Sequence, residues 1–135
     1  PTTTLISVGT NASNGGNALP FICYAWKAVD GVSAFGTYEG TGGALTVTYT
    51  GSNTFTARWV MIKNLGAGSW TVYDSFRSGT SGEIDDYLSP DVNDAEATTA
   101  SYGITFTSTG FTFDSGTTNG TVNGSGANYI YLTFA

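Results

Sequence analysis

Six carboxylates lie close together in one polar stretch of this sequence, and their type and spacing suit two kinds of chemistry. Two carboxylates at a fixed separation, one with a raised pKa, can hydrolyse a glycosidic bond. Several oxygen ligands from one short flexible loop can instead bind Ca²⁺. The spacing fits no EF-hand or similar calcium-binding repeat, so a solvated acidic loop is the simplest interpretation and the two others stay open. The six residues are Glu83, Asp85, Asp86, Asp91, Asp94 and Glu96.

A second candidate site combines aromatic rings with one carboxylate. Trp70, Tyr73 and Asp74 follow each other closely in a segment with strand character. Aromatic faces beside a carboxylate suit carbohydrate rings, so these three residues are a possible glycan contact. Asp74 also stands close to Arg77, and we expect these two residues to form a local ion pair at the end of the strand.

Other catalytic arrangements are excluded by the residue types. The 135 residues include no histidine, which rules out Ser-His-Asp and Cys-His sites and any zinc site that depends on imidazole. Cys23 is the only cysteine, so no disulfide can form within the chain, and its apolar neighbours predict a small core residue. We therefore predict no enzymatic activity, no cofactor and no metal.

The composition limits the partners and the location. Only 10% of residues are charged and the net charge is −6, while the four basic residues are scattered, so nucleic acid is a poor candidate partner. No run of about twenty apolar residues is present, which predicts no membrane insertion. Abundant Thr, Ser, Gly and Asn are typical of extracellular β-proteins, and we expect an extracellular or virion protein. Because the chain begins at Pro1, we expect a processed product, a fragment or a sequence whose start is missing.

Short segments of strand character recur at intervals of about eight to twelve residues. The clearest is 45–50, where large apolar residues alternate with threonines. A continuous apolar run within 54–63 predicts a strand buried on both faces, or a core strand with its ends covered. The other expected strands are 2–8, 21–28, 32–39, 69–76, 104–107, 110–113 and 129–134, with a long loop over 78–100 that contains one helical turn near 95–98. This pattern predicts an all-β fold, an antiparallel β-sandwich of Ig-like or jelly-roll-like type, with its domain at 29–135.

The chain repeats the pattern of its last strand near its beginning. Phe21 matches Tyr129, and Trp26 matches Phe134. In both segments an isoleucine directly follows the first aromatic residue. The offset is about 108 residues, the size of one small domain. Residues 1–28 therefore resemble closing strands that have no domain of their own to close.

Several motifs together resemble a repeat domain of tailed-phage tail-fibre and virion structural proteins and related environmental fibre proteins. The resemblance covers most of residues 21–135 and rests on a collinear set of modest matches. It begins with Val-Ser-Ala-Phe-Gly-Thr-Tyr-Glu-Gly at 32–40 and continues at 58–63, 68–77, 85–88, 93–96, 106–111 and 122–131. In such proteins a strand like 21–26 typically ends one repeat before the next begins, which implies a non-enzymatic structural role in a fibre. The isolated segment 1–28, with no complete repeat before it, departs from the pattern.

The N-terminal segment is expected to pack on a neighbouring unit. A strand with unpaired backbone groups needs partners, and a strand supplied by another chain can provide them. Exchange that does not close on itself generates a helical polymer, so we expect a pilus-like filament built from copies of this chain. The alternative is a receptor- or glycan-binding module of a phage tail fibre, and a hydrolase comes last. The expected interface residues are Leu5, Ile6, Val8, Phe21, Ile22, Tyr24 and Trp26.

Overall fold

The protein is an antiparallel β-sandwich, as its sequence predicts. The computed structural model describes residues 5, 6, 8, 9, 11, 15, 20–50, 54–77 and 83–135. These residues form sheets of four, three and two strands and no α-helix. Side chains from the two larger sheets meet in one core, which includes Ile62 and Tyr129 from the first sheet and Val47 and Phe111 from the second.

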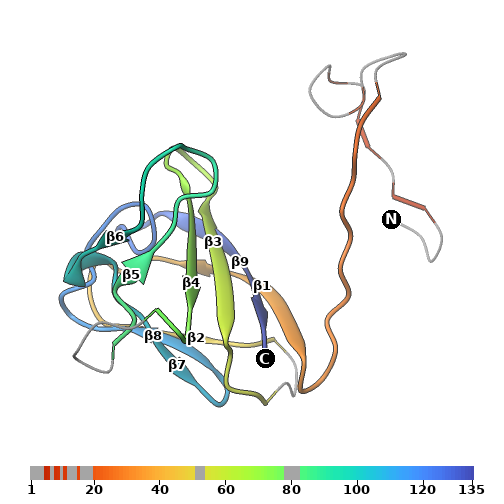
Figure 1. Ribbon diagram of the computed structural model, residues 1–135. Coiled ribbons are helices and arrows are strands. Elements are labelled where there is room, and N and C mark those ends of the chain that lie inside the picture. The colour runs from red at the N-terminus through yellow and green to blue at the C-terminus, as the bar shows by residue number, and fades with distance from the viewer. Residues whose placement is uncertain are drawn as a thin grey trace.

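The four-stranded sheet carries the last strand of the fold in its interior (Figure 1). Its order is β1 (Ser33–Glu39), β9 (Asn128–Phe134), β3 (Trp59–Asn64) and β4 (Trp70–Asp74), all neighbours being antiparallel. β9 thus pairs with β1 on one side and with β3 on the other. β1 lies at the outer edge of this sheet.

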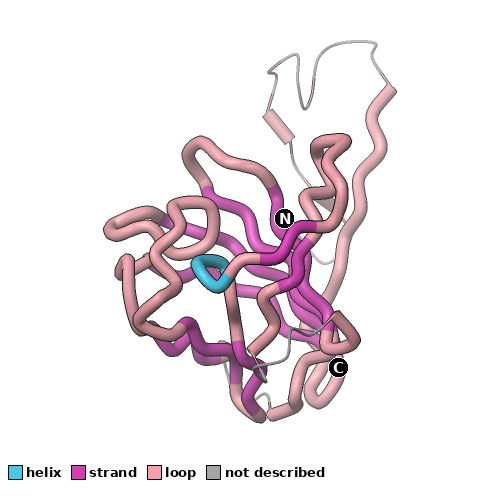
Figure 2. Tube along the Cα trace, turned by 60° about the vertical axis from the view of Figure 1, so that its left-hand side comes forward, coloured by secondary structure: helices cyan, strands magenta, loops and turns pink. Residues whose placement is uncertain are grey.

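The second sheet consists of β2 (Leu45–Thr48), β8 (Gly110–Phe113) and β7 (Thr105–Thr107), in that order. The expected hairpin over 104–113 is confirmed as β7 and β8. A small ladder joins β5 (Asp86–Tyr87) to β6 (Ala97–Thr98), and one turn of 3-10 helix follows at Ala100–Tyr102 (Figure 2).

Alternation of side chains explains why these segments form strands. In β3 the residues Val60, Ile62 and Asn64 are buried, while their neighbours in the strand are half-buried. β9 alternates in the same way, with Tyr129 and Tyr131 pointing into the core. Because successive side chains in a strand point to opposite faces, every second residue can fill a shared core.

Two expectations about elements are wrong. The helical turn expected near 95–98 is a strand at Ala97–Thr98, because its backbone pairs with β5; the 3-10 turn follows it. Residues 21–28 form no strand within the described part of the chain, since they pair with none of its strands. The strand expected at 2–8 lies largely outside the described residues.

Candidate functional site

Residues 20–28, here called the arm, run in extended form away from the sandwich (Figure 1). Ile22, Tyr24 and Trp26 are 83%, 74% and 57% exposed. Alternate side chains of an extended segment share one side, and the stacked rings of Tyr24 and Trp26, with centroids 6.0 Å apart, agree with this. The arm therefore presents an apolar stripe that its own core does not cover.

Hydrogen bonds at the base of the arm determine where it leaves the sandwich. The backbone N–H of Val29 donates to the carbonyl oxygen and to Oγ of Ser33, at 3.2 and 3.1 Å. Ser33 Oγ donates to the carbonyl oxygen of Lys27 at 3.1 Å. Gly31 takes the left-handed conformation (φ 74°) that this tight turn needs. The turn thus joins the arm directly to the edge strand β1.

The seven residues expected at a subunit interface are all exposed. The side chains of all seven are exposed to solvent: Leu5, Ile6 and Val8, and the arm residues Phe21, Ile22, Tyr24 and Trp26. Cys23 is also exposed, so its predicted place in the core is wrong. Its apolar neighbours belong to the arm rather than to a core strand, which is why their character misled the prediction. What these side chains contact in an assembly stays a prediction.

The two larger sheets have very different outward faces. The outward face of the three-stranded sheet carries threonines, and the strand register puts them side by side: Thr46, Thr48, Thr105, Thr107 and Thr112. The outward face of the four-stranded sheet, here called the apolar face, carries large apolar side chains in adjacent rows. These residues are Phe35, Trp59, Met61, Trp70, Val72, Ile130, Leu132 and Phe134.

Ring contacts confirm that the apolar face is continuous across three strands. The ring of Phe134 in β9 lies 6.0 Å from that of Phe35 in β1 and 5.7 Å from that of Trp59 in β3, centroid to centroid. At the β4 end, a hollow of about 270 Å³ is lined by Met61, Trp70, Pro90 and Asp91. The face therefore ends in a recess beside Trp70.

Comparison with known proteins identifies a family for this chain. The model of a domain of unknown function, DUF7483, matches residues 1–135. The chain belongs to the DUF7483 family. No curated protein and no solved structure matches the chain. Within the described ranges, no helix has the length and hydrophobicity needed to span a membrane.

The acidic residues of this DUF7483 chain have separate local roles. Asp91 Oδ1 accepts a hydrogen bond from the backbone N–H of Trp70 at 3.0 Å, and Asp86 accepts one from the hydroxyl of Thr98. Burial, followed by the charges of Asp114 and Asp85, raises the pKa of Glu83. Among the described residues, no three acidic or cysteine side chains are grouped so that they could hold a metal ion. Asp91 and Asp86 thus each accept a separate local hydrogen bond.

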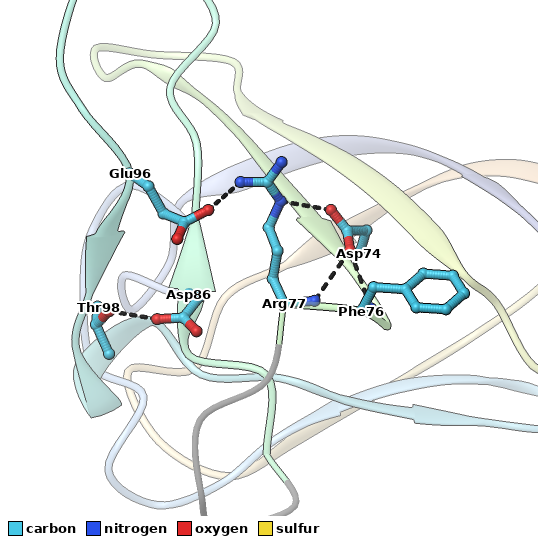
Figure 3. Close-up of polar contacts among 6 residues, drawn as sticks. All are labelled: Asp74, Phe76, Arg77, Asp86, Glu96 and Thr98. Atoms are coloured by element: carbon cyan, nitrogen blue, oxygen red, sulfur yellow. Dashed lines mark hydrogen bonds and ion pairs between the residues drawn. The ribbon is translucent and has the colours of Figure 1, made fainter.

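The expected ion pair between Asp74 and Arg77 is confirmed (Figure 3). Arg77 Nε donates to Asp74 Oδ2 at 2.5 Å, and its Nη1 pairs with Glu96 across the loop. Asp74 Oδ1 also accepts the backbone N–H groups of Phe76 and Arg77, both at 3.0 Å. Burial raises the pKa of Asp74, but these hydrogen bonds and the charge of Arg77 outweigh it and hold the pKa below its usual value.

Replacing Asp74 by alanine is expected to destabilise the domain by about 1 kcal/mol, because the turn loses its acceptor and the half-buried, solvent-screened ion pair adds little. The folded-state pKa of Asp74 is lowered, so its stabilisation is present above about pH 4 and is lost as the pH falls through the folded-state pKa. Thermal unfolding of Asp74→Ala and of the parent chain should therefore converge in acid. Asp94→Ala, at an exposed position in the same acidic stretch, is the control. A stability difference between Asp74→Ala and the parent chain that stays the same at every pH would contradict this role.

The possible glycan contact is not brought together by the structure. Tyr73 is fully buried, and its hydroxyl donates to the carbonyl oxygen of Tyr102 at 2.6 Å. Trp70 and Asp74 lie on the opposite face of β4, because residues an odd number of positions apart in a strand point in opposite directions. The prediction that these three side chains form one glycan-binding platform is therefore wrong.

Proposed function

We propose that this chain is a non-enzymatic structural subunit of an extracellular or virion fibre, which assembles by exchanging N-terminal β-strands between copies. The observation that supports this most strongly is the arm. It is extended, carries an apolar stripe and contributes nothing to the core of its own sandwich. A segment of this kind is stabilised only when another surface covers it.

Strand exchange follows from the chemistry of an extended backbone. Unpaired N–H and C=O groups in an extended segment form hydrogen bonds with another strand, while alternate side chains fill pockets beneath it. A copy that donates its arm to one neighbour and receives an arm from another makes a heterologous contact. Such contacts propagate into a filament when the rotation between copies does not close a ring.

The similarity between the arm and β9 adds support. With the offset of about 108 residues, Ile22, Tyr24 and Trp26 correspond to Ile130, Leu132 and Phe134. β9 is a strand that this fold uses in a sheet interior, paired with β1 and β3. The sequence of the arm is therefore of a type that pairs within this fold.

The energetics are adequate for association. Burying one large apolar side chain stabilises by about 1.5–3 kcal/mol, and the stripe contains three. Association costs about 4–15 kcal/mol in lost freedom. Burial of the stripe thus offsets much of this cost, and new backbone hydrogen bonds and repeated contacts along a filament add to it.

Replacing the stripe in the full chain tests the proposal. The variant Ile22→Thr/Tyr24→Thr/Trp26→Thr is expected to remain folded, because these side chains lie outside the core, and to lose filaments in negative-stain electron microscopy. Circular dichroism should be unchanged. The matched control is Phe76→Thr, which removes an aromatic side chain that is 84% exposed outside the arm and should leave assembly intact. A parent chain that stays monomeric at every concentration, or a stripe variant that still forms filaments, would refute the proposal.

A further inference from the structure

We infer that the apolar face of the four-stranded sheet is the surface that receives the arm of a second copy of this chain. This inference rests on the proposed function and identifies the surface that the side chains of the arm's stripe contact, whereas the backbone pairing of strand exchange takes place at a strand edge. The face consists of side chains from all four strands, and its hollow lies at the β4 end.

The threonine-covered sheet provides an internal comparison. Antiparallel sheets commonly pack one face on the core and expose a polar face to water, and the outward threonines of β2, β7 and β8 follow this rule. The four-stranded sheet breaks it, since Leu132 and its neighbours Phe35 and Met61 point outward in one row. A sheet that is apolar on both faces is typical of one that is covered on both.

The dimensions of the face suit the arm. At about 4.8 Å between strands and about 3.3 Å per residue, four strands and six residues span roughly 14 by 20 Å. An area of roughly 300 Å² is within the range of apolar patches that mark interaction sites. Residues 21–28 in extended form span about 26 Å, so the arm can cross the whole face with its stripe in contact.

The charges are also complementary. Lys27 is the only charged residue of the arm. Glu39 lies at one corner of the outward side of the four-stranded sheet, and Asp91 lines the hollow at its β4 end, against one basic residue, Lys63, on the same side. Asp74 is already paired with Arg77 and adds no net charge. The arm is therefore positive where the face and its rim are net negative. The arm and the apolar face therefore attract each other, whereas the apolar faces of two copies carry the same charge and repel each other.

The arm of a second copy suits this face better than the arm of the same molecule. The hydrogen bonds among Lys27, Val29 and Ser33 direct the arm away from its own sandwich. Both views show the arm leaving the body of the sandwich (Figures 1 and 2). Folding back onto the same face would break this bonded turn, whereas a neighbouring copy can place its arm there with the turn intact.

The first test replaces outward residues of β9 in the full chain. Ile130→Thr/Leu132→Thr places β-branched side chains, which suit a strand, at both positions and gives the outward side of β9 the character of the threonine-covered sheet. Sedimentation velocity should show self-association weakened at least tenfold, with the circular dichroism spectrum retained. Thr46→Ser/Thr48→Ser on the other outward face is the matched control and should associate like the parent. Equal weakening in both variants, or none in the first, would overturn the inference.

The second test uses the natural thiol of Cys23 as one end of a chemical cross-link. A short bismaleimide should link Cys23 of one copy to a new thiol on the apolar face of another in Thr37→Cys, and should not do so in Thr46→Cys on the threonine-covered sheet. Both positions are exposed. A chain that assembles but cross-links only through Thr46→Cys disproves this acceptor site while leaving strand exchange standing. A link within one copy of Thr37→Cys would show that the arm covers its own face, and absence of any assembly would refute the proposed function itself.

Discussion

Raising the pH above about 10 is expected to unfold this domain cooperatively, because its core is built from tyrosines that must stay neutral. Tyr73 is fully buried, and burial, followed by the charges of other tyrosines and of Glu83, raises its pKa well above the ordinary value. Burial raises the pKa of Tyr38 as well, and its hydroxyl donates to the carbonyl oxygen of Val122 at 2.5 Å. Burial likewise raises the pKa of Tyr129 and Tyr131.

The direction of the effect follows from the two states. A tyrosine whose folded-state pKa is raised contributes its full stability below the unfolded-state pKa of about 10, and loses it as the pH rises. Each such tyrosine removes about 1.4 kcal/mol of stability per pH unit. Two of them remove roughly 2.7 kcal/mol per unit, which consumes a typical stability of about 5–15 kcal/mol within a few units.

A titration followed by tyrosinate absorbance and circular dichroism measures this effect. Loss of β-structure and ionisation of the buried tyrosines should occur in one shared transition. Tyr38→Phe should reduce the slope of unfolding free energy against pH by the contribution of one tyrosine, roughly 1.4 kcal/mol per pH unit. Gradual ionisation of all tyrosines with the spectrum of the fold intact would contradict the expectation.

Replacing Asn123 by leucine is expected to destabilise the domain by about 4 kcal/mol or more. Asn123 is fully buried, and its Oδ1 accepts the backbone N–H of Thr41 at 3.0 Å. Its Nδ2 donates to the carbonyl oxygens of Gly43 and Thr117, at 2.7 and 2.8 Å. Leucine has a similar volume but leaves the N–H of Thr41 and the carbonyl oxygen of Thr117 unpaired, at about 1–3 kcal/mol each. The carbonyl oxygen of Gly43 loses one of two donors and keeps the hydroxyl of Thr41 at 3.0 Å.

Chemical denaturation measures this loss directly, and the melting temperature should fall by roughly 15 °C. Asn128→Leu makes the same chemical change at an exposed position of β9 and should alter stability by no more than about 0.5 kcal/mol. A loss below about 1 kcal/mol for Asn123→Leu would mean that the turn after β1 and the connection around Thr117 keep their positions without this side chain.

Strands with a regular pattern could be predicted from the sequence, whereas their partners could not. The alternation of Leu45, Val47 and Tyr49 predicts a half-buried strand, and the structure places β2 there with Val47 buried. Residues 21–28 have the same character but form no strand in the described chain, because side-chain pattern encodes a strand's faces and not its neighbour. β5 and β6 were missed since two residues each are too short to show a period.

For the candidate sites, too, the sequence indicates which way the side chains of one strand face, but not which strands lie next to it. Counting positions along β4 would have separated Tyr73 from Trp70, because residues three apart face opposite ways. The apolar face had a visible signal in the run from Trp59 to Ile62, which predicted cover on both sides of the strand. Only the register of four strands, however, reveals that Leu132 and Phe35 complete the same surface.

The interior position of β9 governs how the four-stranded sheet can form during synthesis. β1 and β3 are made early, yet β9, the strand that pairs with both, is made last of the named strands. Until β9 leaves the ribosome, β1 has no partner within its sheet and β3 has only β4. Such non-local pairing is slow and leaves strand edges exposed. Closure of this sheet therefore waits for the last of its strands, and the nascent chain presents β1 as an open strand until β9 has emerged.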